Sequence, residues 1–150
     1  MNDQAPKRSR EFFNSGYYCA ESVLMAIAES RGVQSDLIPC IATGFCSGMA
    51  RTGGQCGAVS GAMMGISLAT GRRSETETVD RNYTLIQELI RRFEERFGTT
   101  NCRMLLGCDL GTVEGQQTFQ ANRLIEHCFE YAESATLIAL SLLQDYSQAE

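Results

Sequence analysis

The sequence predicts an all-α protein, an irregular bundle of about six to seven helices without a sheet. Apolar residues recur at three- and four-residue steps along most of the chain, whereas the period-two alternation of a strand extends over no useful length. The chain has 150 residues, 43% of them hydrophobic, and only two prolines. These numbers predict one globular domain over residues 1–150, with a core large enough to fold without disulfides.

The N-terminal half contains four predicted helices, which cover residues 8–13, 18–30, 35–45 and 56–70. Gly32 and Gly71 end the second and the fourth, as expected for residues just past a helix C-terminus. Ser35 can cap the third, but Pro39 requires this helix to start late or to bend. Residues 48–54 are glycine-rich and predict a loop.

The C-terminal half begins with the longest predicted helix, residues 74–97. Its apolar stripe recurs at helical spacing and consists of Val79, Tyr83, Ile86, Ile90, Phe93 and Phe97. Gly98 ends this helix, and Thr99-Thr100 caps a short one over residues 101–106. A loop over residues 107–115 leads to one or two final helices, residues 118–127 and 128–146.

Charge and hydropathy exclude several classes of function. The net charge of −5 argues against binding to nucleic acid or to an anionic membrane surface. No apolar run reaches membrane length, so we expect no membrane insertion, and the polar N-terminus does not resemble a signal peptide. A cytoplasmic location is expected, where cysteines stay reduced unless they bind metal or take part in redox chemistry.

Seven cysteines are the main chemical feature, at positions 19, 40, 46, 56, 102, 108 and 128. No CxxC or CxxCH occurs, and the single histidine, His127, rules out a His-rich zinc site. Cys19, Cys56 and Cys102 fall at predicted helix starts, where free amides favour a thiolate. The alternative is that these cysteines are small hydrophobic core residues.

Glycines line one face of the fourth predicted helix, at Gly57, Gly61 and Gly65. Each costs the helix about 1 kcal/mol relative to alanine, so something must approach this face closely. Packing of a second helix is the more common reason; the other is approach of a ligand or a thiol. His127, beside Cys128, is either a proton partner for a thiol or an ordinary hydrogen-bonded side chain.

Four blocks of the sequence resemble the C_GCAxxG_C_C family, whose members are described as redox-active from their cysteines. The blocks are CAESVLMAIAE, GMARTGGQCGAVSGAMMG, FEERFGTTNCRMLLGCDL and the late Cys128. The resemblance runs from about Cys19 to Cys128. It implies that the four family cysteines are Cys19, Cys56, Cys102 and Cys128, and that Gly57, Ala58 and Gly61 complete the signature. It leaves Cys40, Cys46 and Cys108 as additional cysteines, with glycine usual where Cys46 stands.

The leading hypothesis is a redox protein in which the four family cysteines converge. They would cycle between dithiol and disulfide as a thiol-based oxidoreductase or electron carrier with a redox partner, or they would ligate an iron–sulfur cluster or another soft metal. Gly57, Ala58 and Gly61 are the candidate cofactor-binding residues. The alternatives are a binding module with a groove along the glycine face, or a homodimer joined through that face. No nucleotide-binding fingerprint supports an organic cofactor.

Overall fold

The computed structural model describes residues 4–149 and has an all-α fold, as predicted. Within this range lie eight α-helices and one 3₁₀ helix: α1 (Ala5–Asn14), α2 (Cys19–Ser30), η1 (Cys40–Phe45), α3 (Cys46–Arg51), α4 (Gly57–Thr70), α5 (Asp80–Phe97), α6 (Cys102–Leu106), α7 (Val113–Ala121) and α8 (Ile125–Ala149). The described residues contain no sheet; a single antiparallel bridge joins Gln55 and Asn101. The helix count exceeds six to seven because α3 and α6 are very short.

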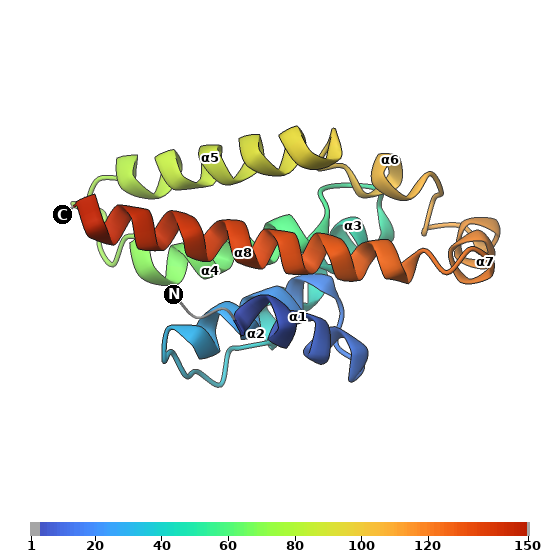
Figure 1. Ribbon diagram of the computed structural model, residues 1–150, viewed down its shortest axis with the longest axis horizontal. Coiled ribbons are helices and arrows are strands. Elements are labelled where there is room, and N and C mark those ends of the chain that lie inside the picture. Colours follow the sequence, from blue (N-terminus) through green and yellow to red (C-terminus); the bar gives the residue numbers. More distant parts are fainter. Residues whose placement is uncertain (1–3, 150) are drawn as a thin grey trace.

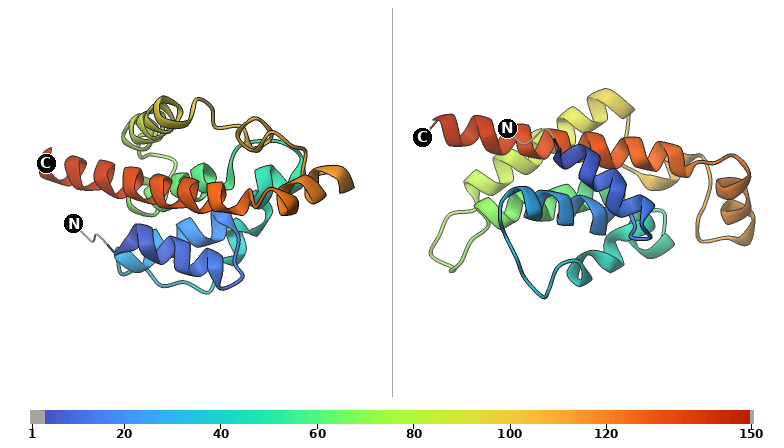
Figure 2. Two further views of the ribbon diagram at one scale, coloured as in Figure 1. Left: turned by 45° about the vertical axis from the view of Figure 1, so that its right-hand side comes forward. Right: turned by 60° about the horizontal axis from the view of Figure 1, so that its bottom comes forward.

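The longest helix, α8, runs along the whole bundle and organises it (Figure 1). Helix α5 lies on one side of α8, and α1 and α2 lie on the other; α4 packs against α2, α5 and α8. The N-termini of α2, α4 and α8 are at the same end of the bundle, where α3, α6 and α7 also lie (Figures 1 and 2). The fold therefore brings several helix starts together.

The core is formed by apolar helix faces. The predicted stripe of residues 74–97 matches the buried face only in part, since Phe93 is buried but Tyr83 is 57% exposed. Leu85, Leu89 and Phe93 are the buried residues of α5, each four positions from the next. In α8 the buried apolar residues include Ala132, Ala135, Ala139, Leu142 and Leu143. Burial of such side chains, at about 25 cal/mol per Å² of apolar surface, drives the packing of the helices. No helix in residues 4–149 is long and apolar enough to cross a membrane.

Three element boundaries differ from the sequence prediction. The predicted third helix is only a 3₁₀ helix from Cys40, because Pro39 lacks the amide hydrogen for a longer one. The long helix starts at Asp80 rather than at position 74. In the preceding segment the Thr78 hydroxyl accepts a hydrogen bond from the Asp80 amide. Threonine side chains often bond to nearby backbone amides in this way, and such a bond competes with the backbone hydrogen bonds of a helix.

The last predicted region forms two helices, and α7 begins at Val113, inside the predicted loop. Thr112 caps α7 by accepting a hydrogen bond from the Gly115 amide at 2.9 Å. The helices separate at residues 122–124, where Arg123 has a φ of +51°. This break turns the chain so that α8 can begin beside the other helix starts.

The segment labelled α3 is a left-handed turn. Ser47, Gly48, Met49 and Ala50 have φ between +57° and +67° with positive ψ, and Arg51 also has positive φ. L-residues pay roughly 1–2 kcal/mol each in this conformation, so a run of four non-glycine residues is held in place by its surroundings. The glycine-rich sequence predicts a loop here, but it does not predict the left-handed backbone conformation.

Candidate functional site

The four family cysteines line one cavity at the end of the bundle where the helix starts meet. Cys19, Cys56, Cys102 and Cys128 belong to four separate segments and share a cavity of about 180 Å³. Exposed residues such as Tyr18, Arg51 and Gln120 also line it, so the cavity reaches the solvent. The structure therefore brings together the cysteines that the sequence resemblance selected.

Close packing of α2 on the glycine face of α4 positions Cys19. A Cβ on Gly61 would lie 2.6 Å from the Ala20 carbonyl oxygen, and one on Gly65 would lie 2.6 Å from Cδ1 of Ile27. A Cβ on Gly57 would overlap the sulfur of Cys19. Helix packing thus explains two of the three glycines, and approach of a thiol explains the third. Because α2 covers Gly61 and Gly65, these two glycines are not open to a ligand or to a second copy of the chain.

The candidate cofactor-binding residues occupy different environments. Gly57 lines the cavity. Ala58 is fully buried, and Gly61 faces the backbone of α2. Neither is among the residues that line the cavity. Of the three signature residues, Gly57 is the one in a position to contact a molecule in the cavity.

A short β-bridge positions Cys56 beside Cys102. The Cys56 amide donates to the Thr100 carbonyl at 2.6 Å, and the Cys102 amide donates to the Gly54 carbonyl at 2.8 Å, on either side of the Gln55–Asn101 bridge. Alternate residues of an extended segment point to the same side, so both cysteine side chains face away from Gln55 and Asn101. The sequence analysis did not predict this bridge, which has no period-two pattern to mark it.

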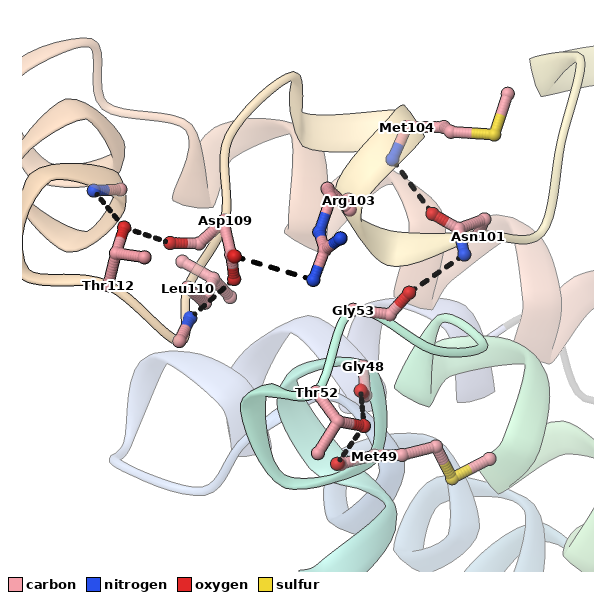
Figure 3. Close-up of polar contacts among 12 residues, drawn as sticks. Gly48, Met49, Thr52, Gly53, Asn101, Arg103, Met104, Asp109, Leu110 and Thr112 are labelled. Atoms are coloured by element: carbon pink, nitrogen blue, oxygen red, sulfur yellow. Dashed lines mark hydrogen bonds and ion pairs between the residues drawn. The ribbon is translucent and has the colours of Figure 1, made fainter.

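Polar contacts fix the loops that surround the bridge (Figure 3). Asn101 caps α6 by accepting from the Met104 amide at 2.9 Å, and its side-chain amide donates to the Gly53 carbonyl at 2.8 Å. Asn101 therefore replaces the predicted Thr99-Thr100 cap. Arg103 pairs with Asp109 at 3.3 Å. These contacts join the left-handed turn, α6 and the loop that carries Cys108.

Cys128 lies one turn into α8 and completes the cavity with aromatic neighbours. Tyr131 lines the cavity, and its hydroxyl donates to the Leu105 carbonyl at 3.4 Å. The Tyr131 ring packs edge-on against Phe97, with centroids 4.9 Å apart. Phe13 forms a similar edge-on pair with Phe129 and also lines the cavity. The cavity walls are therefore mostly apolar.

Burial dominates the electrostatics of the cavity thiols. It raises the pKa of Cys56 to about 12, although the amides of Ala58 and Val59 at the start of α4 act in the opposite direction. Burial, together with Cys108, raises the pKa of Cys102 to about 11. Burial also raises the pKa of Cys128 above its ordinary range. The expectation that helix starts make Cys56 and Cys102 thiolates is therefore wrong, because desolvation outweighs the helix amides.

Two cysteines that the sequence analysis treated as additional belong to the same region. Cys108 interacts electrostatically with Cys102 and Cys128. Cys46 is buried, and Cys19 packs against the apolar cluster that contains it. Cys40, in contrast, is exposed on η1 and donates to the Leu37 carbonyl at 3.2 Å. No local motif marks Cys46 or Cys108, so only the fold reveals their positions.

The remaining candidates from the sequence are also placed by the structure. His127 is exposed, and it is not among the cavity-lining residues that include its neighbour Cys128. All seven cysteines are free thiols. Within residues 4–149, no group of three or more His, Cys, Asp or Glu side chains is arranged to hold a metal ion. An iron–sulfur cluster or another soft metal therefore stays a prediction.

Comparison with known proteins gives two matches. The family described as "Putative redox-active protein (C_GCAxxG_C_C)" matches residues 17–142. An "Uncharacterized protein" of Archaeoglobus fulgidus is 30% identical over 153 residues, which span 95% of each chain. No solved structure matches. The family match covers every cavity-lining residue except Phe13.

Proposed function

The chain belongs to the C_GCAxxG_C_C family, and we propose that it is a thiol–disulfide redox protein whose cavity cysteines exchange electrons with the disulfide of a partner. The observation that carries this proposal is the convergence of Cys19, Cys56, Cys102 and Cys128 on one cavity. These residues are up to 109 positions apart in the sequence. In the cytoplasm, where we place the protein, they would rest as thiols.

The exchange begins at Cys19. Cys19 is partly exposed and lines the cavity, whereas Cys56 and Cys102 are buried. The Ser47 amide donates a hydrogen bond to the Cys19 sulfur at 3.4 Å, which fixes the position of this sulfur. Access therefore selects Cys19 over Cys56 and Cys102 as the thiol that meets the partner.

The reaction transfers two electrons from each protein dithiol to one disulfide. The Cys19 thiolate attacks one sulfur of the partner RS–SR, so a mixed disulfide forms and RS⁻ leaves and takes up a proton. A second cysteine thiolate then attacks the Cys19 sulfur and releases the other RS⁻. The partner is reduced to two thiols, and the two protein thiols become one internal disulfide.

The cavity dimensions favour a small disulfide end over an organic cofactor. Its volume of about 180 Å³ is below the roughly 300–1,000 Å³ of ordinary small-molecule sites. A cystine side chain on a protein or peptide surface is slender enough to enter. The mostly apolar walls, including Phe119 and Leu110, suit the apolar side chain of a cystine.

Thiol counting combined with metal analysis tests this proposal. The protein is purified without oxygen, assayed for iron and sulfide, and its thiols are counted before and after equilibration with oxidised glutathione. We expect a loss of two or four of the seven thiols, none of them Cys40, in metal-free protein. The Cys40→Ser variant is the matched control, because its replaced thiol is exposed and outside the cavity. Stoichiometric iron and sulfide, or no internal disulfide, would contradict the proposal.

A further inference from the structure

We propose that Cys46, which lies outside the four family positions, is the resolving partner of Cys19: it displaces the bound partner and closes a Cys19–Cys46 disulfide. This inference deepens the proposed function and rests on it. It assigns a fifth cysteine to the reaction and names the first internal disulfide to form.

The backbone around Cys46 holds it against the Cys19 sulfur. The next residue, Ser47, donates its amide to that sulfur at 3.4 Å, although 28 positions separate the two residues. Cys19 also packs against the apolar cluster that contains Cys46, Ala20 and Ala42. Gly57 lies behind Cys19, because a Cβ there would overlap its sulfur and would also lie 3.0 Å from the Phe45 carbonyl. Cys19 is therefore enclosed by the segment that carries Cys46.

The Cys46 thiol lies between the Ala42 carbonyl and the Cys19 side chain. Its sulfur is 3.7 Å from the Ala42 carbonyl oxygen. The neighbouring Cys19 thiol and burial raise the pKa of Cys46 well above its ordinary range. Cys46 therefore rests as a protonated thiol beside Cys19.

Burial fixes the order in which the two cysteines react. Cys46 is 4% exposed and does not line the cavity, whereas Cys19 is partly exposed and does. An external disulfide can therefore reach Cys19 and not Cys46. Once Cys19 carries a mixed disulfide, its sulfur becomes the electrophile that Cys46 already contacts. The short approach favours Cys46 over Cys56 or Cys102 as the resolving thiol.

The resolving step balances in atoms and electrons. Cys46 transfers its proton to the departing partner thiolate as its own thiolate attacks the Cys19 sulfur. The bond between Cys19 and the partner sulfur breaks, and the Cys19–Cys46 bond forms. With the first step, one external disulfide is reduced to two thiols while two protein thiols are oxidised.

Disulfide mapping of the full chain after treatment with oxidised glutathione tests the pairing. Trypsin leaves Cys19 on peptide 11–31, and it leaves Cys40 and Cys46 together on peptide 32–51. The Cys40→Ser variant removes this ambiguity and is the form to map, since Cys40 is exposed and donates to the Asp36 and Leu37 carbonyls. We expect peptides 11–31 and 32–51 to be joined by a disulfide in this variant.

A second variant measures the resolving step itself. In the Cys40→Ser/Cys46→Ala variant, the disulfide-joined peptides should be absent. The fraction of protein in which Cys19 carries glutathione as a mixed disulfide should rise from a trace in Cys40→Ser to most of the protein. Circular dichroism checks that this variant is folded; if it is not, the map of the Cys40→Ser form alone decides.

The outcomes separate the inference from the proposed function. Cys19 joined to peptide 52–72, 97–103 or 124–150, with Cys46 still free to alkylate, would overturn the inference and leave the proposed function standing. No oxidation of any cavity cysteine would overturn the proposed function, and the inference with it.

Discussion

Replacement of Gly61 by alanine tests the close packing that places Cys19 at the cavity. The new Cβ would lie 2.6 Å from the Ala20 carbonyl oxygen, 3.0 Å from its Cα and 3.1 Å from Cβ of Val23. Two of these three atoms are backbone, which cannot rotate out of the way. Helix α2 must therefore move away from α4, and Cys19 must move with it.

The expected loss in unfolding free energy is about 2 kcal/mol. Overpacking of a filled core costs about 1–3 kcal/mol, and the backbone contact at Gly61 places this variant at the upper end. The gain in helix propensity from glycine to alanine returns about 1 kcal/mol. Gly65→Ala is the matched control, because it has the same propensity gain but its three nearest atoms belong to the Ile27 side chain and not to the backbone. We expect Gly65→Ala to change stability by less than about 1 kcal/mol.

Urea unfolding followed by circular dichroism measures both variants, with the slope of the transition checked for two-state behaviour. Alkylation of Cys19 should also become faster in Gly61→Ala, because α2 no longer presses this cysteine against Gly57. A Gly61→Ala protein as stable as the wild type, or less affected than Gly65→Ala, would refute the argument that α2 and α4 are in backbone contact.

Three further changes test other parts of the structure. Asn101→Ala removes the α6 cap and the bond to Gly53, so it should cost about 1–2 kcal/mol in urea unfolding and speed alkylation of Cys102; unchanged values would argue against the network. Ala50→Gly should be neutral or stabilise by up to about 1 kcal/mol, because Ala50 has a φ of +57°; a loss of about 1 kcal/mol, the normal cost of glycine in a right-handed helix, would contradict the left-handed turn. Burial raises the pKa values of Cys56 and Cys102 to about 12 and 11, compared with about 8.5 for a thiol in the unfolded chain. This difference stabilises the folded state fully below about pH 8.5, and the stabilisation is lost as the pH rises toward the folded-state pKa values. The urea midpoint should therefore fall above about pH 9 and fall less in Cys102→Ala; an equal fall in both would assign the loss to other groups.

The helical stripes were predictable because burial of one helix face leaves a 3.6-residue pattern in the sequence. In α5 this pattern located the helix, but the buried residues are Leu85, Leu89 and Phe93, and the predicted stripe contained only the last of them. The left-handed turn after Cys46 was not predictable, since Ser47, Met49 and Ala50 carry no preference for positive φ. Its conformation depends on contacts with α2 and α6, which are distant in sequence.

The set of cavity cysteines was predictable from the four sequence blocks, but the state of the thiols was not. Sequence position places Cys56 at a helix start, where amides favour a thiolate; only the structure shows that it is 6% exposed and that burial prevails. Cys46 has no motif around it, and its contact with Cys19 arises because η1 returns to the start of α2. Long-range contacts of this kind are absent from local sequence patterns.

A redox titration of the Cys40→Ser protein tests the central claim most directly. The protein is equilibrated in glutathione buffers of known potential, its free thiols are alkylated, and each cysteine peptide is quantified by mass spectrometry. The account predicts that cavity thiols are lost in pairs into internal disulfides, with the two-electron dependence of about 30 mV per tenfold change in the ratio of oxidised to reduced protein. Independent glutathionylation of single cysteines, without any internal disulfide, would contradict it.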